Sequence, residues 1–168
     1  MNRPAFDQIL RRLTEAEVEF VLVGGLALGA WGVVRGTKDV DIVVAPDPEN
    51  LKRIAEVAVE ARGHVQKGEA FLSTSFSIAA ELANGERVAI ETELGLLDVV
   101  RGLDGVPSYA ELHASAVDTE ILGVKVAVCS MSALRQMKQA DGQASRSSRH
   151  RRPRCNRRLA LRSAFQPR

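Results

Sequence analysis

The most constraining feature of this chain is a short apolar strand that ends in two glycines and precedes a second strand with two aspartates. Val21-Leu22-Val23 lead into Gly24-Gly25, and Asp39-Val40-Asp41-Ile42 follow after a spacer of thirteen residues. The apolar run from Leu26 to Trp31 predicts a small helix between the two strands. Because side chains alternate across a strand, we expect Asp39 and Asp41 to face the same side of one sheet.

This pairing of glycines and carboxylates indicates a particular chemistry. Two neighbouring carboxylates repel each other unless a cation such as Mg²⁺ lies between them. A glycine turn at the start of a helix leaves backbone N–H groups available and lets a phosphate approach closely. The combination is suited to metal-assisted phosphoryl or nucleotidyl transfer. An Asp-x-Asp pair alone would instead be typical of a solvated strand edge or a turn.

The rest of the pattern predicts an α/β or α+β domain, with helices and mixed strands around one sheet. Apolar spacing predicts helices over about 7–17, 48–61, 107–113 and 130–139, and strands over 20–23, 40–44, 87–91 and 95–100. Residues 121–128 are expected to form a hairpin through Gly123. Ala70–Ala79 is a weaker strand candidate, and Asn84-Gly85 predicts a hairpin turn before Arg87. We expect Trp31 and Cys129 to be core residues.

One further carboxylate stands out on a later strand. Asp98 interrupts the apolar run Gly95 to Val100, where an unpaired carboxylate would be costly. It is either a third metal ligand or an aspartate at a strand end. Glu91 and Glu93 are the alternatives, since they share one face of a strand.

Val23-Gly24-Gly25 and Asp39-Val40-Asp41-Ile42 resemble the signature of the nucleotidyltransferase superfamily that includes DNA polymerase beta. The sequences of segments 22–27 and 35–41 resemble those of the minimal nucleotidyltransferases related to abortive-infection toxins of the AbiEii type. The resemblance covers roughly residues 5–142. It implies a nucleotidyltransferase fold, a mixed β-sheet flanked by helices, and a third carboxylate at the place of Asp98.

The resemblance implies an enzyme that moves a nucleoside monophosphate from an NTP such as ATP to a hydroxyl of RNA, including a tRNA end, or of a protein. Its setting would be a toxin–antitoxin or phage-defence system, with a cognate antitoxin or toxin as partner. The expected catalytic and metal-binding residues are Asp39, Asp41 and Asp98, with two Mg²⁺ ions or Mn²⁺ instead. The expected nucleotide-binding residues are Gly24, Gly25, Arg35, Thr37 and Lys138.

Other interpretations remain open. Arg35, Thr37 and Lys38 either contact triphosphate or line a solvated loop, and Lys138 is otherwise an exposed helical lysine. The alternatives to an enzyme are a non-catalytic nucleotide-binding module that acts as a partner or antitoxin, and an inactive truncated product. We expect a cytoplasmic protein without a membrane partner, because no apolar run approaches the roughly 20 residues of a membrane span and no secretory signal pattern is present.

Charge divides the chain into two parts. Residues 1–142 carry 14 Lys and Arg against 21 Asp and Glu, whereas residues 143–168 carry nine Arg, no Lys and no acid. We therefore expect a nucleotidyltransferase domain over 1–142 and a basic tail over 143–168. The tail has few apolar residues to bury, which favours disorder in isolation.

Two hypotheses account for this tail. Arg, Ser, Pro and Ala are typical of a GC-rich gene read out of frame, and codons permitted for the tail allow the next frame to read Arg-Pro-Arg-Asp directly after Gly142. The related proteins carry such a turn there, so we favour a frameshift of one nucleotide near codon 143. The alternative is a genuine basic arm that binds RNA phosphates.

Overall fold

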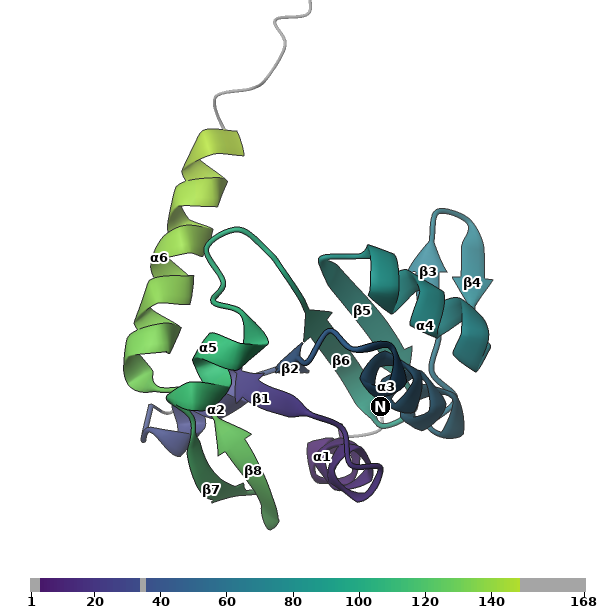
Figure 1. Ribbon diagram of the computed structural model, residues 1–168, viewed down its shortest axis with the longest axis horizontal. Helices are drawn as coiled ribbons and strands as arrows, with labels where there is room; N and C mark the ends of the chain where they lie inside the picture. The colour runs from purple at the N-terminus through teal and green to yellow at the C-terminus, as the bar shows by residue number, and fades with distance from the viewer. Residues whose placement is uncertain (1–3, 34–35, 149–168) are drawn as a thin grey trace, which may run out of the picture.

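The computed structural model of the chain describes residues 4–33 and 36–148 (Figure 1). These residues form six α-helices and eight β-strands. The helices are α1 (Phe6–Glu15), α2 (Gly24–Ala30), α3 (Pro48–Glu60), α4 (Ser75–Asn84), α5 (Tyr109–Ala114) and α6 (Met131–Ser148). The strands are β1 (Phe20–Val23), β2 (Asp39–Val44), β3 (Val65–Lys67), β4 (Ala70–Leu72), β5 (Arg87–Thr92), β6 (Gly95–Val100), β7 (Val117–Ile121) and β8 (Val124–Val128).

A mixed sheet of six strands organises the described residues, in the order β5-β6-β2-β1-β8-β7. Strand β2 pairs antiparallel with β1 and parallel with β6, while β3 and β4 form a separate two-stranded sheet. Apolar side chains from the central strands and from α1, α3 and α4 share one core, with Leu10, Val21, Ile42, Ile54 and Ile78 among the fully buried members. The expected mixed sheet flanked by helices is therefore confirmed.

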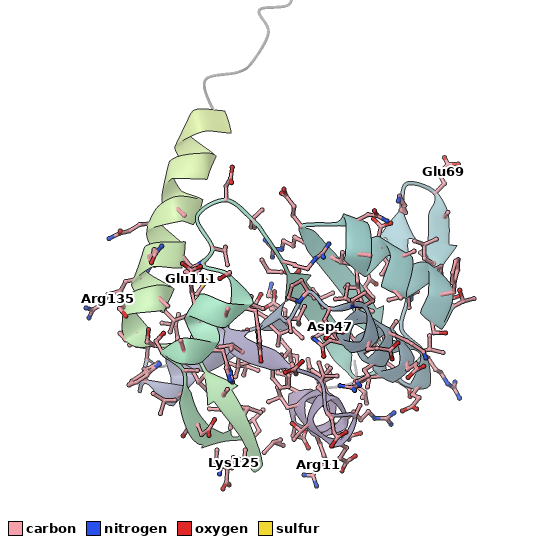
Figure 2. All side chains as sticks on the ribbon, in the orientation of Figure 1. Arg11, Asp47, Glu69, Glu111, Lys125 and Arg135 are labelled. Atoms are coloured by element: carbon pink, nitrogen blue, oxygen red, sulfur yellow. The ribbon has the colours of Figure 1, made fainter. Side chains whose placement is uncertain are left out.

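The buried side chain of Asn50 links α3 by hydrogen bonds to the residues that flank β1 and β2. Its side-chain amide donates to the carbonyl oxygens of Glu19 and Ala45, both at 3.0 Å, and its Oδ1 accepts from the Glu19 N–H at 2.8 Å. Three residues earlier, the Asp47 side chain accepts from the N–H groups of Glu49 and Asn50 and caps the helix (Figure 2). These bonds fix the position of β2 relative to α3.

Two local predictions were wrong, and helix capping explains both. The segment Ala70–Ala79 is not one strand, because β4 ends at Leu72 and α4 begins at Ser75. Thr74 and Ser77 form a reciprocal capping box that stabilises this helix start. Asn84 ends the same helix and Gly85 is its C-cap residue, so the pair Asn84-Gly85 is a helix end and not a hairpin turn.

Helix α6 extends further than its apolar pattern predicted, from Met131 to Ser148. The loop after β6 packs against it, because a Cβ atom on Gly105 would lie 2.3 Å from Cβ of Ala140. In the view of Figure 1, α6 and the β3–β4 hairpin lie at opposite ends of the molecule. Arg35 and residues 149–168, most of the basic tail, lie outside the described residues.

One core expectation was confirmed and the other was wrong. Cys129 is fully buried, and burial raises the pKa of its thiol to about 12. Trp31 is 41% exposed, and its indole Nε1 donates to the Cys129 carbonyl oxygen at 3.0 Å. In the part of the chain that the structure describes, no helix has both the length and the apolar character to cross a membrane.

Candidate active site

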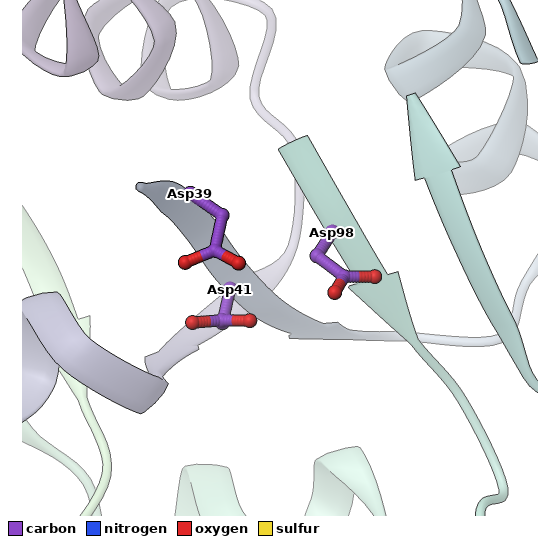
Figure 3. Close-up of side chains that lie close together, drawn as sticks. All are labelled: Asp39, Asp41 and Asp98. Atoms are coloured by element: carbon purple, nitrogen blue, oxygen red, sulfur yellow. The ribbon is translucent and has the colours of Figure 1, made fainter. Parts of the chain in front are cut away.

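The sheet topology brings three aspartates to one place. Strand β2 lies between β1 and β6, and Asp41 is in register with Asp98 on β6 and with Val23 at the end of β1. Because Asp39 lies two residues before Asp41, all three carboxylates share one face of the sheet. One carboxylate oxygen from each lies within 4.8 Å of the others (Figure 3).

The two alternatives to Asp98, Glu91 and Glu93, lie outside this cluster. Glu91 is exposed on β5 and its Oε2 lies 3.9 Å from Nε2 of His64. Glu93 falls in the turn after β5, where it forms an exposed ion pair of 3.7 Å with Arg62. The structure groups Asp98 with Asp39 and Asp41, and it does not group either glutamate with them.

The two glycines let β2 approach the start of α2. Gly24 has a φ of +67°, and a Cβ atom there would lie 2.0 Å from Oδ2 of Asp41. A Cβ atom on Gly25 would lie 2.7 Å from Oγ1 of Thr37. Side chains at either position would therefore displace the residues that border the carboxylates, and only glycine adopts the Gly24 conformation readily.

Thr37 contacts the acidic cluster directly. Its Oγ1 lies 3.0 Å from the Asp39 carbonyl oxygen and 3.1 Å from Asp39 Oδ1, within donor distance of both. The sequence suggested a phosphate contact for this residue. The observed bonds give Thr37 a second task, which is to orient the Asp39 carboxylate.

Crowding perturbs the ionisation of Asp41. Burial, followed by the negative charges of Asp39 and Asp98, raises the pKa of Asp41 to about 6. A backbone hydrogen bond from Gly25 and the positive charge of Arg87 act in the opposite direction. The raised pKa means that the cluster holds its negative charge unfavourably without a further cation.

Asp98 is the buried member of the cluster, with a side chain only 3% exposed. Arg87 on the neighbouring strand β5 donates to Asp98 Oδ2 through Nε at 2.9 Å and through Nη2. Sequence reasoning missed Arg87, since an arginine on an edge strand is usually solvated. Only the register of β5 on β6, with Ala89 opposite Asp98, reveals that Arg87 is a diagonal neighbour of Asp98 on the same face.

The donor set fits a hard divalent cation. Oδ1 of Asp98 is buried and has no hydrogen-bond partner among the described residues. An uncompensated buried carboxylate oxygen is costly, and Mg²⁺ and Mn²⁺ prefer carboxylate oxygen ligands. Asp39, Asp41 and Asp98 are therefore the residues that could hold such an ion.

A cavity of about 760 Å³ opens in front of Asp39 and Asp41, large enough for a nucleotide-sized ligand. Gly24, Gly25, Thr37 and Lys138 line it, as do Asp39 and Asp41. Lys38, which the sequence offered as a phosphate contact, also lines it, and Arg87 and Arg135 add positive charge that the sequence did not single out. Apolar side chains from the loop after β6 and from α6 complete the wall: Leu103, Val106, Met131, Leu134 and Met137.

Two solved structures share this fold. The chain resembles a candidate nucleotidyltransferase from Thermotoga maritima with a TM-score of 0.57 and 18% identity, over 87% of this chain and 88% of that one. It also resembles the antibiotic-resistance factor ANT(2'')-Ia with a TM-score of 0.54 and 18% identity, over 89% of this chain and 75% of the other. At this identity the likeness shows the fold. Comparison with curated protein sequences finds no match.

A comparison with protein families gives a more specific result. The family described as "Nucleotidyl transferase AbiEii toxin, Type IV TA system" matches residues 8–127, which include β1, α2, β2 and β6. The match covers most of the chain and all three aspartates, and it confirms the resemblance seen in the sequence. The chain belongs to the AbiEii nucleotidyltransferase toxin family of type IV toxin–antitoxin systems.

Proposed function

We propose that this protein is a metal-dependent nucleotidyltransferase, which moves a nucleoside monophosphate from an NTP such as ATP to a hydroxyl group and releases pyrophosphate. The observation that carries this proposal is the grouping of Asp39, Asp41 and Asp98 within 4.8 Å, beside a glycine turn. The cavity in front of Asp39 and Asp41 supplies space and positive charge for a triphosphate. Membership of the AbiEii family supports the same reaction class.

Each group has a defined task in this proposal. Asp39, Asp41 and Asp98 hold Mg²⁺ or Mn²⁺, which when bound would stabilise the charge that develops on the phosphates. Gly24 and Gly25 let the phosphates approach the start of α2, and Lys138 neutralises phosphate charge from α6. Asp98, whose carboxylate Arg87 holds in place, would also draw the proton from the acceptor hydroxyl.

We propose RNA, including a tRNA end, or a protein as the acceptor, and a cognate antitoxin as the partner. Support for the partner comes from the family, which belongs to type IV toxin–antitoxin systems. A cytoplasmic location follows from the proposed substrates, since NTPs and tRNA are found there. Arg35 remains a proposed nucleotide contact outside the described residues.

The test is transfer of label from α-³²P-labelled NTPs to total RNA and to total protein, with Mg²⁺ or Mn²⁺ present. Asp41→Asn removes one charge of the cluster while its amide oxygen can accept the Gly25 N–H. Asp118→Asn is the matched control, because Asp118 is an exposed aspartate on β7. We expect labelling by the parent and by the control, and at least a ~100-fold slower rate for Asp41→Asn.

Three outcomes would overturn the proposal. Equal labelling by Asp41→Asn and the parent would show that the aspartate cluster is not the site of the reaction. Binding of ATP and metal without any turnover would favour a non-catalytic nucleotide-binding module, and absence of both would favour an inactive product.

A further inference from the structure

Arg87 occupies an unusual place beside the acidic cluster. Its guanidinium donates hydrogen bonds from both Nε and Nη2 to a single oxygen, Oδ2 of Asp98. Its side chain is 57% exposed and lines the cavity, whereas the Asp98 side chain is 3% exposed. Among the side chains that the structure describes, those of residues 4–33 and 36–140, Arg87 is the only cation joined by an ion pair to one of the three aspartates.

This pairing divides the two oxygens of Asp98 between two tasks. Oδ2 accepts from Arg87, and Oδ1 has no hydrogen-bond partner among the described residues. In Figure 3 one oxygen of Asp98 is turned toward Asp39 and Asp41, and the other is turned away from them. Arg87 therefore holds the carboxylate in the orientation in which one oxygen is presented to its two acidic neighbours.

Electrostatics give the pair a second consequence. Three carboxylates whose oxygens lie within 4.8 Å of one another repel each other. The Arg87 guanidinium, paired with Asp98, supplies one compensating positive charge. A divalent ion bound by the cluster would lie near this positive charge. The guanidinium would therefore repel the ion and weaken its binding.

We propose that Arg87 is the built-in counter-ion of the acidic cluster, and that it keeps the affinity for a free divalent ion low. It makes the metal-free site stable enough to fold, and it positions Asp98 without touching the reacting atoms. The functional consequence is that metal enters together with the negatively charged nucleotide, whose phosphates offset the repulsion from Arg87. This inference rests on the metal site of the proposed function.

The experiment compares the full-length parent with Arg87→Met, Arg87→Lys and Arg62→Met. Methionine keeps the length of the apolar stem but removes the charge, and lysine restores a positive charge. Arg62→Met is the matched control, because Arg62 forms an exposed ion pair with Glu93, which is not part of the cluster. Two quantities are measured without any turnover: the affinity for Mn²⁺ alone by electron paramagnetic resonance, and the melting temperature in EDTA.

We expect Arg87→Met to bind Mn²⁺ about tenfold more tightly than the parent, since a nearby positive charge has been removed. Its melting temperature in EDTA should be lower, whereas Mn²⁺ should stabilise it more than it stabilises the parent. Arg87→Lys and Arg62→Met should behave like the parent in both measurements. Equal or weaker Mn²⁺ binding by Arg87→Met, or no binding by any variant, would overturn the proposal.

A double variant covers the case in which Arg87→Met does not fold. Adding Asp98→Asn to Arg87→Met removes the buried charge that has lost its partner, so the melting temperature in EDTA should rise again. A double variant no more stable than Arg87→Met would contradict the counter-ion role. Failure of nucleotidyl transfer with the expected Mn²⁺ affinities would overturn the proposed reaction and leave the role of Arg87 standing.

Discussion

Gly24 lies so close to Asp41 that a Cβ atom at position 24 would stand 2.0 Å from Oδ2 of the carboxylate. The alanine methyl group of Gly24→Ala would therefore push Asp41 out of the cluster, and a φ of +67° would add backbone strain. We expect a loss of nucleotidyl transfer of about 100-fold, the size of effect that a misplaced group of about 1 Å causes. Initial rates of label transfer check this.

Gly29→Ala is the control for that substitution. Gly29 lies in the same helix, α2, and a Cβ atom there would meet nothing within 4 Å. We expect unchanged transfer and a small gain in stability, because alanine favours helix more than glycine by about 1 kcal/mol. Similar rates for both variants would show that the contact between Gly24 and Asp41 does not matter for activity.

Thr37 is expected to act through the orientation of Asp39. Thr37→Val keeps the shape of the side chain but removes the hydroxyl that contacts Asp39 Oδ1 and the Asp39 carbonyl. We expect Mn²⁺ affinity and transfer rate to fall about tenfold or more, as for other groups that orient metal ligands. Thr37→Ser, which keeps the hydroxyl, should behave like the parent. If both variants matched the parent, the hydroxyl would have no such role.

The raised pKa of Asp41 predicts how stability depends on pH in EDTA. The folded state holds the Asp41 proton up to a pKa of about 6, against an ordinary value of 3.8. This group therefore lowers the free energy of unfolding as the pH rises between these two values, and leaves it constant above them.

Asp41→Asn removes that titration. Its free energy of unfolding, relative to the parent, should be higher at about pH 8 than at about pH 5, because only the parent bears the unfavourable charge at the higher pH. Urea denaturation at both pH values measures the difference. If the difference in free energy of unfolding between variant and parent were equal at the two pH values, the pKa of Asp41 would not be raised in the folded state.

Asn50 should be more important for stability than its polar character suggests. Asn50→Ala leaves the Glu19 N–H and the buried Ala45 carbonyl without their side-chain partner, whereas the Glu19 carbonyl still accepts from the Ala45 N–H. We expect a loss of about 3 kcal/mol by urea denaturation, since each unsatisfied buried group costs about 1–3 kcal/mol. Lys52→Ala, an exposed change in the same helix, should cost less than about 0.5 kcal/mol.

The Arg-rich segment 143–168 leads to a prediction about the gene. Sequencing from an independent template across codons 138–168 should show that the frame one nucleotide later is open and encodes Arg-Pro-Arg-Asp after Gly142. A closed frame would favour a genuine basic arm. Binding of RNA should then weaken steeply with salt, because nine arginines would release counterions.

Local patterns predicted much of the fold. The apolar runs of β1 and β6 and the helical spacing of α3 agree closely with the observed elements, since these segments have one obvious periodicity. The prediction failed around Thr74 and Asn84, where capping by neighbouring residues decided between helix and strand. Strand β3 was not predicted, because its three residues have too little pattern to recognise.

The sequence by itself determined the pair Asp39 and Asp41 and the glycine turn, because alternation along one strand and the freedom of glycine are properties of neighbouring residues. Tertiary structure alone decided that Asp98, and not Glu91 or Glu93, completes the cluster, since this depends on the register of β6 on β2. It likewise decided that Arg87 pairs with Asp98, a contact between two strands whose alignment no local pattern encodes.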